Sequence, residues 1–98
     1  MSTEVKDFSA STIIKKDYLL TQREIEYLAL VALGYHNHEI AKILYVSFHT
    51  VRKTLENIFK KLNAIDRANA VTIAFIHHIL NVSVLTDILQ TYEIKINF

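Results

Sequence analysis

Three charged side chains, Arg52, Lys53 and Glu56, have the types and spacing to make directed hydrogen bonds from one face of a helix. In the major groove of DNA, arginine and lysine donate to guanine edges, and glutamate can accept from cytosine. Two simpler interpretations stay open. The basic residues can form the solvated face of an ordinary helix, and Glu56 can be an i,i+4 ion-pair partner of Arg52 or Lys60.

The helix that carries these residues is predicted from about Phe48 to Leu62. Ser47 is a suitable N-cap, and the following residues divide into two faces. The apolar stripe consists of Val51, Leu55, Ile58 and Leu62, and the charged side of His49, Arg52, Lys53, Glu56 and Lys60. The helix therefore has one face for a core and one for a partner or for solvent.

Two further helices are expected before it. Thr21 and Glu24 have the spacing of a capping box, which begins a helix from about Gln22 to Leu33, with Leu20 packing on Ile25. Gly34, the only glycine of the chain, is placed to end that helix. A short helix then leads through a three-residue turn to Ser47, with Ile40, Leu44, Val46 and Val51 spaced to bury between the two helices. This arrangement lets the helix from about Phe48 to Leu62 enter a major groove, and it favours DNA binding over a solvated face.

Many positions resemble, in order, the LuxR-type helix-turn-helix domain, including its stand-alone GerE-like members. The matching residues are Leu20 to Glu24, Gly34, Asn37, Glu39 to Ala41, Leu44, Val46, Ser47, Thr50 to Arg52, Asn57, Ile58, Lys61, Leu62, Arg67, Ala70 and Val71. The resemblance covers roughly Tyr18 to Leu80. It implies an all-α, four-helix, sequence-specific DNA-binding domain of bacterial transcription regulators, usually dimeric through its last helix.

The resemblance also implies a role for individual residues. Base-reading side chains fall at positions matching Arg52, Lys53 and Glu56. Contacts to the DNA backbone are implied for Asn37, His38, Ser47, Thr50, Asn57, Lys60 and Lys61.

The chain departs from the family pattern at several positions. His36 replaces a serine or threonine cap and His38 a lysine, so the second helix is expected to be less well capped and to lose a phosphate-seeking charge. Asn63 replaces a common glycine, although asparagine tolerates a left-handed conformation. Thr54 stands where histidine is frequent. We expect these changes to affect affinity more than fold.

A fourth helix is predicted from an Asp66 cap to about Leu80, with apolar residues on two sides. One side can pack on the bundle, and the other is expected to form a homodimer interface of Ile73, Ile76, His77 and Leu80. The alternative is that the tail folds back over this second face. Beyond it, Ser83 can cap a short helix with a stripe of Leu85, Ile88, Leu89 and Tyr92, followed by an alternating segment of Ile94, Ile96 and Phe98 typical of a strand or an extended arm.

The predicted organisation is an N-terminal arm over residues 1–17, mobile at least from Met1 to Ser9, a helix-turn-helix domain over 18–80 and a C-terminal extension over 81–98. Larger members of the resembled family carry a receiver or ligand-binding domain before this module, so the short arm predicts a stand-alone regulator. The extension can enlarge the dimer interface or bind another protein.

Composition narrows the function classes. Eleven lysines and arginines nearly balance ten acidic residues, so DNA affinity must come from the local basic patch. The absence of cysteine excludes disulfides and thiolate metal sites. We see neither a secretory signal nor an apolar stretch long enough to span a membrane, and expect a cytoplasmic protein.

Nothing in the sequence indicates an enzyme, a cofactor or a metal site. The pairs His36 with His38 and His77 with His78 lack the i,i+4 spacing of two ligands on one helix face, and no nucleophile stands with a base. The competing function is a protein-interaction module with weak or no DNA binding, which would engage a regulator or polymerase subunit through the fourth helix and tail. The basic residues of the 48–62 helix favour DNA.

Overall fold

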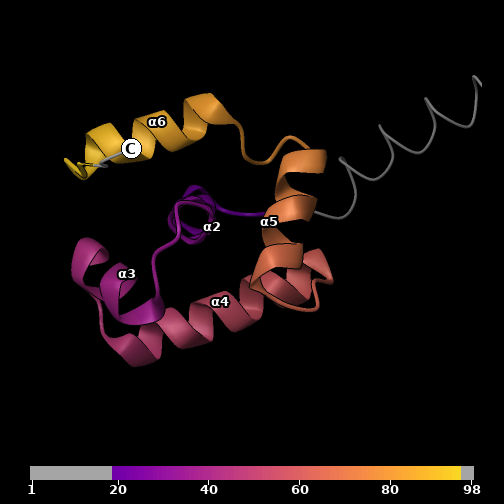
Figure 1. The fold of residues 1–98 in the computed structure, drawn as a ribbon. Helices are drawn as coiled ribbons and strands as arrows, with labels where there is room; N and C mark the ends of the chain where they lie inside the picture. Colours follow the sequence, from indigo (N-terminus) through magenta and orange to yellow (C-terminus); the bar gives the residue numbers. More distant parts are fainter. Residues whose placement is uncertain (1–18, 96–98) are drawn as a thin grey trace, which may run out of the picture.

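The computed structural model describes residues 19–95, and over that range the chain folds into helices without strands (Figure 1). The helices are α2 (Gln22–Ala32), α3 (Asn37–Leu44), α4 (Phe48–Leu62), α5 (Arg67–Ile76) and α6 (Val82–Thr91). The predicted all-α class is confirmed. The predictions for the N-terminal arm, and for Ile96 and Phe98, lie outside the described residues.

Helix α2 is the centre of the fold. Figure 1 views it end-on, with α4 on one side and α6 on the opposite side, and it contacts α4, α5 and α6. Its residues Tyr27 to Val31 are all buried, because neighbours surround it in several directions. The rest of the core comes from Leu80, between α5 and α6, and from one stripe of each other helix: Ile40, Ala41, Leu44, Val51, Leu55, Ile58, Leu62, Ala70, Ala74 and Ile88.

The two ends of α2 follow the sequence prediction. Thr21 and Glu24 form the capping box: the Glu24 amide donates to Thr21 Oγ1 at 3.0 Å, and the Thr21 amide donates to Glu24 Oε1 at 2.8 Å. Gly34 has a φ of +98°. The amides of Gly34 and Tyr35 donate back to the carbonyls of Val31 and Leu30, the pattern of a Schellman cap. The glycine therefore turns the chain away from α2 toward α3.

The turn between α3 and α4 is tight and well satisfied. Tyr45 adopts a left-handed conformation with φ 58°, and the Val46 amide donates to the Ala41 carbonyl at 3.0 Å. Ser47 then caps α4, accepting a 3.0 Å bond from the Thr50 amide. Ile40 and Val51 are fully buried between the two helices. The predicted helix-turn-helix is therefore present.

Helix α5 is shorter than predicted. Asp66 caps it as expected, accepting from the Asn69 amide at 2.8 Å, but the helix ends at Ile76 rather than near Leu80. His78 takes a φ of +61°, and the amides of Ile79 and Leu80 both donate to the Ala74 carbonyl. This reversal turns Leu80 into the core, where it is 1% exposed. No glycine or proline marks the position, so the sequence pattern gave no stop signal.

Helix α6 begins at a different cap from the predicted one. Asn81, not Ser83, accepts the capping bond from the Val84 amide at 2.9 Å. The expected apolar stripe is confirmed, with Ile88 buried and Tyr92 partly buried. The helix packs against α2. The tail does fold back, but onto α2, and Ile76 on α5 stays 64% exposed.

Candidate nucleic-acid interface

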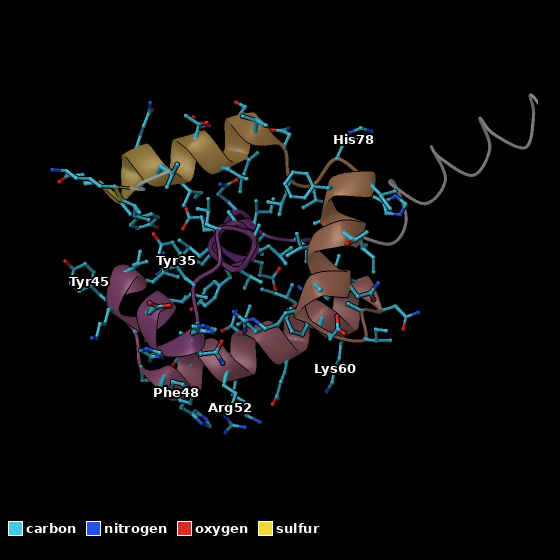
Figure 2. All side chains as sticks on the ribbon, viewed as in Figure 1. Tyr35, Tyr45, Phe48, Arg52, Lys60 and His78 are labelled. Carbon is cyan, nitrogen blue, oxygen red and sulfur yellow. The ribbon has the colours of Figure 1, made fainter. Side chains whose placement is uncertain are left out.

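The outer face of α4 presents the predicted base-reading residues to solvent. Figure 2 shows Phe48, Arg52 and Lys60 along the edge of α4 that faces away from α2. Four apolar residues of the same helix, Val51, Leu55, Ile58 and Leu62, point into the core. Because the inner stripe fixes the rotation of the helix, the charged residues are held outward and apart from the body of the protein.

Arg52, Lys53 and Glu56 lie together on this face. Arg52 Nη1 is 3.6 Å from Glu56 Oε2, and Lys53 Nζ is 3.9 Å from Glu56 Oε1. Arg52 Nη2 also donates to His49 Nδ1 at 3.3 Å. All three charged side chains are about half exposed, so these pairs are weak and readily exchanged for other partners. Of the alternatives open for Glu56, the ion pair with Arg52 is present here, and Lys53 is a second partner.

Most of the predicted backbone contacts surround this face. Ser47, Thr50, Asn57 and Lys60 are exposed on α4 or at its start. The Ser47 hydroxyl donates to Thr50 Oγ1 at 2.9 Å, which pairs the two hydroxyls at the N-terminal end of the helix. Unpaired amides and a partial positive charge at such an end favour a phosphate. This end of α4 therefore combines polar side chains with a favourable dipole.

Lys61 has a structural partner that is distant in the sequence. Its Nζ donates to both carboxylate oxygens of Glu24 on α2, at 3.0 and 2.9 Å. Glu24 is the one charged residue among the buried ones of the described chain. Burial acts to raise the pKa of the Glu24 carboxyl, but the bonds from Lys61 and the Thr21 amide outweigh it and lower that pKa. Lys61 thus joins α4 to α2, and its ammonium group is paired with Glu24 instead of being directed to a phosphate.

Arg67 is a second residue with a structural role that depends on contacts distant in the sequence. Its guanidinium donates to the Tyr35 carbonyl at 2.7 Å and to Asn37 Oδ1 at 2.8 Å. It therefore connects the start of α5 to the loop before α3 and orients the Asn37 side chain. The Asn37 amide oxygen is used in this contact, so its NH₂ group is the part suited to a phosphate.

The start of α3 carries the two histidines that depart from the family pattern. His36 makes no capping bond with its side chain. The Glu39 carboxylate instead accepts from the His36 amide at 2.8 Å, so α3 keeps half of a capping box. The His36 and His38 rings are stacked, with centroids 6.3 Å apart and planes at 6°. Both residues are exposed.

The C-terminal extension is fastened to α2 by a polar cluster on the side away from α4. The Tyr92 hydroxyl donates to Glu26 Oε1 at 2.7 Å and accepts from Arg23 Nη1 at 3.1 Å. Arg23 also donates to the Leu44 carbonyl at the end of α3. Burial, together with the bond to Glu26, raises the pKa of Tyr92. Helix α6 therefore leaves the outer face of α4 uncovered.

Helix α5 exposes part of the predicted dimer surface. Ile76 is 64% exposed, Phe75 is more than one-third exposed, and Ile73 and His77 are partly buried. Leu80, by contrast, is inside the chain and unavailable to a partner, which corrects its assignment to the interface. Phe75 replaces it as an exposed apolar residue on this helix.

Within residues 19–95 no group of acidic, histidine and cysteine residues could hold a metal ion. In the same range no helix is long and apolar enough to cross a membrane.

The fold, in which α3 and α4 are joined by a tight turn and α4 has a basic outer face, defines a helix-turn-helix domain. A family model described as "Bacterial regulatory proteins, luxR family" matches residues 18–74, which is more than half of the chain. The chain therefore belongs to the luxR family of bacterial regulatory proteins. Helix α6 lies beyond the matched residues.

Relatives of the chain include response regulators. The response regulator protein VraR of Staphylococcus aureus is 44% identical over 62 residues, which cover 63% of this chain and 30% of VraR. The VraR proteins of Staphylococcus saprophyticus and Staphylococcus epidermidis match with the same identity and coverage. The chain thus spans about 30% of the length of these curated relatives. No solved structure matches the chain significantly.

Proposed function

We propose that the chain is a transcription regulator that binds double-stranded DNA in a sequence-specific manner and reads the major groove with α4. The observation that carries this proposal is the outward placement of Arg52 and Lys53 on a helix whose opposite face is fully buried. The match to a family of regulatory proteins supports it, as do relatives named as response regulators.

In this proposal Arg52 and Lys53 donate to base edges, and Glu56 either accepts from a cytosine or releases its two cations when they meet DNA. Asn37, His38, Ser47, Thr50, Asn57 and Lys60 hold the DNA backbone. These groups lie at the N-terminal ends of α3 and α4 and along the outer face of α4. Backbone contacts fix the position of the helix, and the base contacts supply the sequence preference.

We further propose that the protein acts as a homodimer through α5, with Ile73, Phe75, Ile76 and His77 at the interface. Large exposed apolar side chains gathered on one helix are costly on a surface that stays in water. Because a two-fold dimer presents two copies of α4, it would read two related half-sites.

The test is selection of bound sequences from a random DNA pool, followed by titration of the selected site. We expect Arg52→Ala with Lys53→Ala to weaken specific binding, each lost base contact costing about 1–3 kcal/mol. The matched control is Lys42→Ala with Lys95→Ala, which removes the same charge from residues that are exposed but outside α4. Equal losses in the two double variants would mean that only net charge matters, and the base-reading assignment would be wrong.

A protein-interaction function predicts a different result. The pool would then yield no enriched sequence, and binding would be weak and would disappear with added salt in all variants alike.

A further inference from the structure

Phe48 is a large apolar residue exposed at the beginning of α4. Its side chain is 52% exposed, whereas the other apolar residues of that helix are buried or partly buried. It is the first residue of the helix, directly after the Ser47 cap, and the bond from the Thr50 amide to Ser47 fixes this end of α4. The backbone that carries the phenyl ring is thus fixed, and the ring projects from it into solvent.

Phe48 and Arg52 share a face of α4. They are four residues apart, which places them one above the other on a helix, and both lie at the outward edge of α4 in Figure 2. Arg52 is itself about half exposed. The ring therefore adds an apolar surface one turn before a half-exposed guanidinium whose pairs with Glu56 and His49 are weak and exchangeable. This end of the helix has no acidic residue in its first turn.

A phenyl ring can neither donate nor accept a conventional hydrogen bond, so it cannot read most base edges. The apolar group that the four bases present in the major groove is the C5 methyl of thymine. We infer that Phe48 is a specificity-determining residue that contacts a thymine methyl beside the base pair read by Arg52. This inference rests on the proposed function, because it requires α4 in the major groove.

The contact is tested by replacing each thymine of the selected site, one at a time, with deoxyuridine, which lacks only the methyl group. At one position in each half-site the unaltered protein should bind about fourfold more weakly, the equivalent of about 0.8 kcal/mol for one methyl group. Phe48→Ala should bind the thymine and uracil sites equally. Because Phe48 is half exposed, this variant should keep its melting temperature within about 2 °C.

Ile65→Ala is the matched control, since Ile65 is an exposed apolar residue just beyond the opposite end of α4. It should keep the full preference for thymine over uracil. The inference is overturned if the unaltered protein has no uracil-sensitive position, or if Phe48→Ala keeps the same sensitivity. In either case a selected site that is still bound leaves the proposed function standing. If no sequence is selected at all, the proposed function fails, and this inference fails with it.

Discussion

The ion pair between Glu24 and Lys61 should make a measurable contribution to stability. Glu24 is 9% exposed, and two bonds of 2.9 and 3.0 Å join it to Lys61. Removing one partner of a fully buried pair costs about 3–5 kcal/mol. The Lys61 side chain is 35% exposed, so solvent screens this pair, and a smaller effect is expected.

The two partners should not be equivalent. Lys61→Met leaves a buried carboxylate whose remaining hydrogen bond comes from the Thr21 amide. We expect this variant to lower the free energy of unfolding by about 2 kcal/mol. Glu24→Gln keeps an oxygen for the Thr21 amide and leaves a lysine that can turn to water. We expect it to cost about 1 kcal/mol.

The pH dependence follows from the lowered pKa of Glu24. A carboxyl whose pKa is lower in the folded state stabilises the fold above its unfolded pKa, near 4.5, and this contribution is lost as pH falls through the folded value. Glu24→Gln should therefore lose stability at pH 7 and show a shallower decline in acid. Urea titrations from pH 7 to pH 3 measure both effects. Equal costs for the two substitutions, or an unchanged acid decline in Glu24→Gln, would refute this reasoning.

Three other changes should give distinct results. Glu56→Gln removes the carboxylate near Arg52 and Lys53, so it should tighten binding to unrelated DNA a few-fold at low salt. Titrations at high salt should abolish this effect. Weaker binding to unrelated DNA would contradict the ion-pair role of Glu56. Tyr92→Phe removes the bond to Glu26 and should cost about 1 kcal/mol in urea unfolding. The raised pKa of Tyr92 means that its hydroxyl stabilises the fold below pH 10 and that this stabilisation is lost at higher pH. The stability of Tyr92→Phe should therefore fall less in alkali. An equal fall in the variant and the unaltered protein would exclude this contribution of Tyr92. Ile76→Asp should shift the protein from dimer to monomer in sedimentation and should weaken operator binding. Gln90→Asp on α6 is the control and should do neither. A monomer that binds DNA as tightly as the unaltered protein would contradict the proposed dimer.

Local signals in the sequence predicted most of the fold. The capping box at Thr21, the glycine after α2, and the caps at Ser47 and Asp66 each act within a few residues, so residue type and local spacing identified them. The predicted end of α5 was wrong because the chain turns at His78, which adopts a left-handed conformation. A glycine or asparagine at that position would have indicated such a turn. Ser83 was predicted to cap α6, whereas Asn81 does so; both residue types cap helices well, so residue type alone does not locate the cap.

The long-range contacts of the site could not be read from spacing. Lys61 is 37 residues from Glu24, and Arg67 is 30 residues from Asn37. Only the packing of α2 against α4, and of α5 near the α2–α3 loop, brings these partners together. Lys61, which the family resemblance placed among the contacts to the DNA backbone, therefore joins α4 to α2 through Glu24. The outward direction of Arg52 and Lys53, in contrast, followed from the apolar stripe opposite them.

Chemical methylation of guanine tests most directly whether Arg52 reads a base edge in the major groove. Dimethyl sulfate methylates guanine N7 in the major groove and adenine N3 in the minor groove, and N7 is one of the two acceptors that an arginine contacts. With the selected site, the unaltered protein should protect one guanine N7 in each half-site, and Arg52→Ala should leave that guanine reactive. Protection confined to adenine N3, or guanine protection that persists in Arg52→Ala, would contradict the account.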